Sequence, residues 1–162
     1  LIALNFDESQ RDEAANIARQ VADKNRSKNT RVVTFFGKIE MEMSDLADDE
    51  ARMFMDEYGI KESALNTLIR EAYALLGLQS FFTVGEDECR AWTIRKGMTA
   101  QESAGAIHSD FVAKFIRAEV VHYENFISHG GSFAKVKEAG LWNLEGKEYV
   151  VQDGDLMEIR HS

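Results

Sequence analysis

Residues 81–115 read FFTVGEDECRAWTIRKGMTAQESAGAIHSDFVAKF, and this stretch decides the fold of the C-terminal half. Its pattern predicts a β-hairpin with strands over 81–84 and 89–94, followed by a helix that begins after Thr99. Thr99 and Glu102 have the spacing of a capping box, in which each side chain accepts a hydrogen bond from the other residue's backbone N–H. The helix then has a narrow apolar stripe at spacings of four and three, formed by Ala100, Ala104 and Ile107.

A hairpin followed by a helix that crosses it is how a β-grasp, ubiquitin-like domain begins. Beyond residue 115 the sequence predicts short helices over 124–128 and 133–139. It predicts further strands over 115–121, 149–152 and 156–159, and a turn at His108 to Asp110. The fold class expected for this half is α+β.

The N-terminal half has the pattern of a parallel strand–helix–strand unit. Apolar residues 1–4 and 31–36 predict two strands buried on both faces, and residues 9–24 predict the helix between them. Such strands are parallel and are joined by a right-handed crossover. Two strands do not form a stable sheet alone. We therefore expect them to be the edge of a larger α/β sheet, and the chain, which begins in mid-strand at Leu1, to be a fragment of a longer protein.

Two helical stretches connect the halves. Residues 44–58 begin with acidic side chains, which suit the positive end of a helix dipole, and offer Met53, Phe54 and Met55 as core candidates. Residues 62–76 have apolar residues at helical spacing, and Gly77 is the expected stop.

Composition excludes several classes of protein. The chain has 162 residues, of which 44% are hydrophobic, so it can form a core. No apolar run approaches the roughly 20 residues of a membrane helix. The single cysteine, Cys89, excludes an internal disulfide and fits a reducing cytoplasm. The net charge of −9 argues against binding of nucleic acid through bulk positive charge, so any RNA contact must come from a local patch.

Several segments resemble the YchF / Obg-like ATPase family, which are Obg-related P-loop NTPases of the TRAFAC class. RAWTIRKGMTAQESAGAIHSDF, FIRAEVV and EGKEYVVQDGDLMEI are similar to the TGS domain that ends this family, and LNTLIREAYALLGLQSFFT and LNFDE extend the resemblance over nearly the whole chain. The resemblance implies a remnant of the nucleotide-binding domain over 1–56, a connecting helix over 57–77 and a β-grasp TGS domain over 78–162. It further implies a cytoplasmic, ribosome- or RNA-associated parent protein that hydrolyses ATP, or less selectively GTP, with Mg²⁺ and regulates translation or a stress response.

Asn5-Phe6-Asp7-Glu8 follows a buried parallel strand at its carboxyl end, where α/β sheets bind ligands. Ras-like domains have Asn-Lys-x-Asp here, in which Asn braces the loop and contacts the purine and Asp accepts from guanine. The YchF-type pattern resembles Asn-x-x-Glu, which Asn5 and Glu8 fit. Phe6 replaces the lysine that lies along the base, and Glu8 is one methylene longer than Asp, so both argue against guanine specificity. The second base-side loop is expected over 36–40, where the Gly37 amide reaches the ring. The alternative is an ordinary Asx turn.

No Gly-x-x-x-x-Gly-Lys-Ser/Thr loop occurs, so we expect this chain to hydrolyse no nucleotide by itself. The four histidines are too dispersed for a metal site, and Cys89, which has no adjacent histidine, is expected to be a small core residue and not a nucleophile. The sequence therefore predicts no catalytic residue and no metal ligand.

A local basic and aromatic cluster is the candidate contact with RNA or the ribosome. Its alternative is a solvated face with the tryptophan in the core. The candidates are Arg90, Trp92, Arg95, Lys96, Lys114 and Arg117. A different class also remains open for the whole chain, namely a non-enzymatic β-grasp adaptor that binds RNA or protein and has no nucleotide role. No membrane association and no sequence-specific DNA binding are expected.

Overall fold

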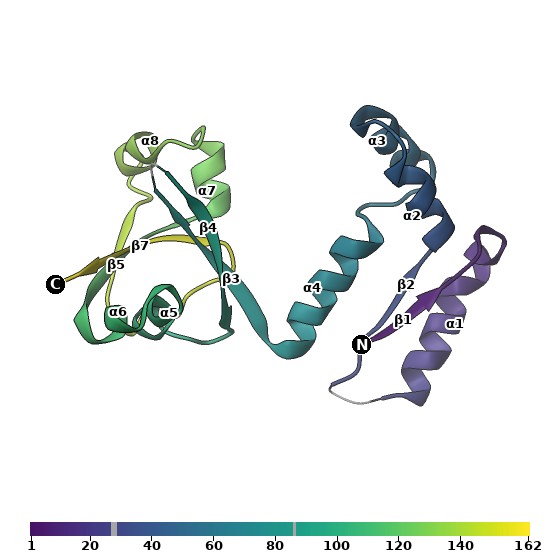
Figure 1. The fold of residues 1–162 in the computed structure, drawn as a ribbon, viewed down its shortest axis with the longest axis horizontal. Helices are drawn as coiled ribbons and strands as arrows, with labels where there is room; N and C mark the ends of the chain where they lie inside the picture. The colour runs from purple at the N-terminus through teal and green to yellow at the C-terminus, as the bar shows by residue number, and fades with distance from the viewer. Residues whose placement is uncertain (27–28, 86) are drawn as a thin grey trace. The chain divides into compact units, whose positions relative to one another are not determined.

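The computed structural model describes residues 1–26, 29–85 and 87–162. They form two compact units, Leu1–Leu76 and Gly77–Ser162, and Figure 1 labels most of their helices and strands. The family resemblance assigns residues 1–56 to a nucleotide-binding domain, 57–77 to a connecting helix and 78–162 to a TGS domain. This assignment of domain types remains a prediction.

The first unit contains a two-stranded parallel sheet, as the sequence predicted. Asn5 is opposite Phe35 in the register of the two strands, so both strands end at the same edge. The elements, in order, are β1 (Ile2–Asn5), the 3₁₀ helix η1 (Glu8–Gln10), α1 (Arg11–Lys24), β2 (Val32–Phe35), α2 (Gly37–Ser44), α3 (Asp48–Glu57) and α4 (Ala64–Leu76).

Burial in this unit differs from the expectation of a strand enclosed on both faces. Ala3 and Asn5 of β1 are exposed. The physical reason is that the sheet has only two strands and that α1 and α4 pack mainly against β2, so side chains that alternate along β1 are less covered.

The segment after β2 also departs from the sequence prediction. The loop expected over 36–40 is the first turn of α2, which begins at Gly37 because Ile39 and Met43, four residues apart, are both buried on one helix face. The next helix begins at Asp48 and not at residue 44. Met53 is 74% exposed, because neighbouring residues on a helix cannot all face the core, and it is the adjacent Phe54 that stacks on Tyr58.

The second unit is a five-stranded mixed sheet with the order β4-β3-β7-β5-β6. β3 and β7 are parallel, and the other neighbouring pairs are antiparallel. The strands are β3 (Leu78–Val84), β4 (Cys89–Arg95), β5 (Phe115–His122), β6 (Asn143–Glu145) and β7 (Asp155–His161). The predicted hairpin is confirmed, with Val84 opposite Cys89.

Helices lie on both faces of this sheet (Figure 1). The helices are α5 (Ala100–Ile107), α6 (Ser109–Lys114), α7 (Tyr123–Ser128) and α8 (Phe133–Glu138). Ala100 of α5 belongs to a core cluster with Phe81 and Met157. Phe126 of α7 and Val136 of α8 belong to a separate cluster. The sheet thus separates two small cores.

The predicted capping box of α5 is confirmed. The Thr99 backbone N–H donates to Glu102 Oε2 at 2.8 Å, and the Glu102 backbone N–H donates to Thr99 Oγ1 at 3.3 Å. Two orphan donors at the start of the helix are satisfied in this way.

One strand prediction in the second unit was wrong, and the sequence predicted neither β6 nor α6. Residues 149–152 form no strand, because their backbone bonds to the start of α5: Ala100 N–H donates to the Tyr149 carbonyl at 2.7 Å, and Val151 N–H donates to the Met98 carbonyl at 3.1 Å. β6 takes the edge beside β5 instead. The turn expected at His108 leads directly into α6, whose Asp110 backbone N–H donates to His108 Nδ1 at 3.2 Å.

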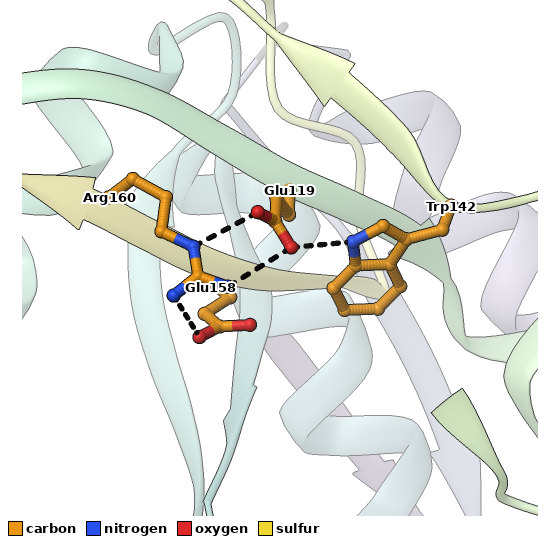
Figure 2. A network of polar contacts seen from close by, with 4 residues as sticks. All are labelled: Glu119, Trp142, Glu158 and Arg160. Atoms are coloured by element: carbon orange, nitrogen blue, oxygen red, sulfur yellow. Dashed lines mark hydrogen bonds and ion pairs between the residues drawn. The ribbon is translucent and has the colours of Figure 1, made fainter. Parts of the chain in front are cut away.

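A polar network joins β5, β7 and the segment before β6 (Figure 2). Glu119, which is 9% exposed, accepts from Arg160 Nε at 3.0 Å and from Trp142 Nε1 at 2.7 Å. These donors, Arg160 first and then Trp142, hold the pKa of Glu119 below its ordinary value. Glu158 contacts the outer side of the same guanidinium at 2.9 Å. The network therefore fixes Trp142 at the edge of the sheet.

Candidate functional site

The side chain of Asn5 bridges the carboxyl ends of the two parallel strands. Its Oδ1 accepts a hydrogen bond from the backbone N–H of Gly37 at 2.9 Å. A Cβ at position 37 would lie 3.0 Å from that oxygen, so glycine permits the close approach. The structure thus brings together two of the predicted base-binding residues, at the edge where α/β sheets bind ligands.

Phe6 supports this loop from the core. It is 7% exposed, and its ring centroid lies 6.4 Å from that of Phe36, the residue before Gly37. The two aromatic rings therefore anchor the two loops that Asn5 and Gly37 join. A contact between Phe6 and a base remains a prediction.

Asp7 is occupied by local hydrogen bonds. It is the N-cap of η1, where its Oδ1 accepts from the Ser9 backbone N–H at 3.1 Å and from the Ser9 hydroxyl at 2.7 Å. These bonds lower the pKa of Asp7, with a smaller contribution from the charge of Lys38. Because Asp7 is committed to the cap, Glu8 is the carboxylate of this tetrapeptide that remains available for a ligand.

Glu8 lies near Tyr58, which follows α3. The negative charge of Glu8 is the first cause that raises the pKa of the Tyr58 hydroxyl. Arg11 donates to the Tyr58 carbonyl, and its guanidinium lies 5.6 Å from the centre of the Tyr58 ring. The ring of Phe54 stacks on the ring of Tyr58, with centroids 4.5 Å apart. Sequence reasoning missed Tyr58 and Arg11, because no local pattern links positions 47 residues apart.

Arg90 and Trp92 are the only two predicted RNA contacts that the structure brings into stacking contact. The Arg90 guanidinium lies 4.1 Å from the centre of the Trp92 ring. Trp92 Nε1 donates to Thr83 Oγ1 at 2.9 Å, and the half-buried ring packs against the core. One face of the tryptophan is therefore covered by the arginine.

The other four candidates do not join this pair. Arg95 lies five residues along β4, roughly 17 Å away, and points to the opposite face because strand side chains alternate. Lys96 follows the strand end. Lys114 ends α6 and pairs with Asp110 at 3.7 Å, and the exposed Arg117 lies in β5, three strands from β4 and so roughly 14 Å across the sheet.

Within residues 1–26, 29–85 and 87–162, no group of three or more His, Cys, Asp or Glu side chains has an arrangement that would hold a metal ion. None of the helices in the described part of the chain is long and apolar enough to cross a membrane. Cys89, expected to be a small core residue, is exposed.

The fold and the site define a parallel α/β segment with a polar loop at the carboxyl edge of its strands, followed by an α+β unit with a mixed sheet. The family YchF-GTPase_C, described as "Protein of unknown function (DUF933)", matches residues 78–162. This chain belongs to the YchF family. The fold of the whole chain is similar to a solved structure, "Structure of the Schizosaccharomyces pombe YchF GTPase", with a TM-score of 0.78 and 28% identity over 98% of this chain and 42% of that one.

Curated relatives are closer in sequence. The "Ribosome-binding ATPase YchF" of Bacillus subtilis is 54% identical over 132 residues, which are 82% of this chain and 36% of the relative. The "Obg-like ATPase 1" of Gallus gallus is 46% identical over 126 residues, which are 78% of this chain and 31% of the relative. The chain thus spans about a third of the length of the curated relatives it matches.

Proposed function

We propose that this chain forms the C-terminal part of a longer, cytoplasmic, ribosome-associated ATPase that accepts GTP less selectively and regulates translation or a stress response. Relatives that are about half identical to the chain are named ribosome-binding ATPases, and this supports the proposal. The chain's own share of the work is recognition of the purine base and attachment to the ribosome. Residues outside this chain would bind the phosphates and Mg²⁺.

The hydrogen bond between Asn5 and Gly37 is the observation that carries the nucleotide part of the proposal. Since Oδ1 of Asn5 is used by Gly37, its Nδ2 group is oriented away from that bond and is able to donate to a purine N7. Glu8 is an acceptor for the exocyclic amine of adenine. The Gly37 loop would lie against the ring. The amide donor of Asn5 complements the N7 acceptor of adenine, and the carboxylate acceptor of Glu8 complements its N6 amine donor.

Calorimetric titration of ATP and GTP into the full-length protein tests this assignment. Asn5→Ala removes both the loop brace and the base contact, and we expect ATP affinity to fall by about tenfold or more. Asn16→Ala is the matched control, because Asn16 is exposed on α1. The affinity of this variant for ATP should equal that of the unchanged protein. Equal ATP affinity for Asn5→Ala and the unchanged protein would remove Asn5 from the base site and would favour the non-enzymatic adaptor.

We propose further that residues 78–162 are a TGS-type β-grasp module that contacts ribosomal RNA or protein. The strand order β4-β3-β7-β5-β6, with β3 and β7 parallel at the centre and α5 crossing the sheet, supports this assignment. Co-sedimentation of the 162-residue chain with Bacillus subtilis ribosomes at low salt tests it. A chain that stays in the supernatant would contradict the ribosome-binding role.

A further inference from the structure

The first unit contains a cavity that three arginines line. Its volume is about 590 Å³, and its walls come from α1, from the segment before β2, from the start of β2 and from α4. The arginines are Arg19, Arg26 and Arg31. The cavity lies at the amino end of β2, whereas Asn5 and Gly37 lie at the carboxyl ends of the strands, so it is separate from the candidate base site.

Small side chains leave this space open beside the sheet. Ala18 and Ala22 are about one helical turn apart on α1, and both line the cavity. Val32 and Val33, at the start of β2, line it as well. The cavity therefore combines a small apolar surface with long cationic side chains, whose charged ends are able to reach a ligand that rests on that surface.

Two carboxylates also line the cavity, and each is paired with an arginine. Asp23 Oδ1 lies 2.9 Å from Arg26 Nη2. Glu71 Oε1 lies 3.6 Å from Arg70 Nη2. The negative end of the α1 dipole is close by as well, and Lys24 in the last turn of the helix offsets it. These negative groups are therefore compensated by cations other than Arg19 and Arg31.

Arg19 and Arg31 are the cationic groups that remain for a ligand. Both are exposed, and neither has an ion pair within residues 1–26, 29–85 and 87–162. A planar guanidinium binds a phosphate through two parallel hydrogen bonds, and it is more weakly hydrated than an ammonium group. Two such groups at one cavity therefore suit a phosphate ligand.

The sequence around the cavity is basic although the chain is acidic. Residues 14–33 contain five basic side chains and one acidic side chain, a net charge of +4. The rest of the chain contains 14 basic and 27 acidic side chains, a net charge of −13. Since RNA has a negative charge on every nucleotide, it is attracted by this segment and repelled by the chain as a whole. The cavity is thus the kind of local basic patch that an acidic chain needs for contact with RNA.

We propose that this cavity binds the phosphate backbone of ribosomal RNA through Arg19 and Arg31. The inference rests on the proposed association with the ribosome and adds a contact in the first unit. The two guanidinium groups hold a phosphate, and the sugar rests on the apolar surface of Ala18 and Ala22. Because the contact is with the backbone and not with base edges, it carries no preference for sequence.

Alanine variants of the two arginines test this contact. Arg19→Ala and Arg31→Ala should each raise the Kd for protein-free Bacillus subtilis ribosomal RNA, measured by filter binding at low salt, by about fivefold or more. Each variant should also reduce the slope of log Kd against log salt concentration by about one, which a purely structural role would not do. Arg52→Ala is the matched control: it removes the same charge from an exposed position on α3, and its Kd should stay within about twofold.

Lysine variants separate the charge from the loss of a side chain. Arg19→Lys and Arg31→Lys keep the cation but lose the planar fork, so their salt slopes should match that of the unchanged chain and their Kd values should rise by about threefold or less. Salt slopes that fall in the lysine variants as far as in the alanine variants would overturn the assignment of these arginines to phosphate.

Co-sedimentation with ribosomes distinguishes the remaining outcomes. Unchanged affinity of both alanine variants for protein-free RNA overturns this inference and leaves the ribosome association standing. Weaker binding of the variants to ribosomes but not to protein-free RNA would overturn it in favour of an acidic protein surface. An unchanged chain that does not bind ribosomes overturns the proposed function as well. Circular dichroism checks that the variants fold, which we expect because both arginines are exposed.

Discussion

Replacement of Glu119 by glutamine should destabilise the second unit by about 2 kcal/mol. The glutamine amide can accept from either Arg160 or Trp142, but its NH₂ group then faces the other donor. Loss of a buried ion pair costs about 3–5 kcal/mol, and a hydrogen bond to a charged group contributes about 1.5–3 kcal/mol. The smaller range, that for a hydrogen bond to a charged group, applies here. The Arg160 side chain is 45% exposed and keeps its contact with Glu158, so it is not left as a buried unpaired charge.

Glu158→Gln is the matched control. This change removes a carboxylate that contacts the same guanidinium. Because the Glu158 side chain is 51% exposed, the free energy of unfolding should fall by only about 0–1 kcal/mol. Urea or thermal unfolding followed by tryptophan fluorescence measures both variants, since the two tryptophans, at 92 and 142, both lie in Gly77–Ser162. For a domain of this size about 2 kcal/mol corresponds to a fall in Tm of roughly 8–16 °C.

The destabilisation should depend on pH in a definite direction. The pKa of Glu119 is lowered in the folded state, so its carboxylate stabilises the fold fully above the ordinary glutamate pKa of about 4.3. As the pH falls below that value the unfolded chain takes up the proton first, and the contribution is lost. The difference in free energy of unfolding between the unchanged protein and Glu119→Gln should therefore become smaller below about pH 4.3. The reasoning would be refuted if Glu119→Gln and Glu158→Gln lowered the free energy of unfolding equally at pH 7. It would also be refuted if the difference in that free energy between the unchanged protein and Glu119→Gln stayed constant as the pH falls.

Three further predictions follow from the local geometry. Thr99→Ala should cost about 1 kcal/mol by the same fluorescence assay, because the Glu102 backbone N–H loses its cap, whereas Thr99→Ser should retain most of the stability. Gly37→Ala should weaken ATP binding by the full-length protein by about fivefold, because the new Cβ displaces Asn5 Oδ1; Gly146→Ala, where a Cβ meets nothing within 4 Å, should leave affinity unchanged. The purified 162-residue chain should release no phosphate from ATP in a malachite-green assay, since its sequence has no phosphate-binding loop, and turnover would contradict this.

Local sequence signals predicted the parts of the fold that depend on local physics. The capping box at Thr99 and Glu102 and the β3–β4 hairpin depend on residue spacing within short windows, and the parallel β1–β2 pair follows from the strand–helix–strand order and the rule for crossovers. In each case the hydrophobic period and the backbone signals agree.

Predictions failed where a distant partner decides the conformation. Val151 is buried and lies in an apolar run, which is typical of a strand, yet its N–H bonds to the Met98 carbonyl before α5. β6 could not be predicted, because it is three residues long and its Leu144 is 61% exposed, so no alternation marks it. α2 was missed because glycine at its first position is typical of a loop.

The candidate base site was predictable only in part. Asn5 and Glu8 were found by a resemblance to a motif, and their position follows from the general rule for parallel sheets. Tyr58, whose hydroxyl pKa is raised first by the charge of Glu8, follows α3, and no spacing within a local window of the sequence could reveal this neighbour. Family resemblance therefore located the residues, and tertiary structure supplied their neighbours.

The alternation of side chains along β4 limits the proposed contact with RNA. Arg90 and Trp92 point to the face of α5, whereas Cys89 and Ala91 point to the face of α7. The Arg90 guanidinium covers one side of the Trp92 ring, and the ring packs against the core, so a base could stack on this tryptophan only after Arg90 leaves the ring. An RNA contact through Trp92 would therefore carry the cost of that rearrangement.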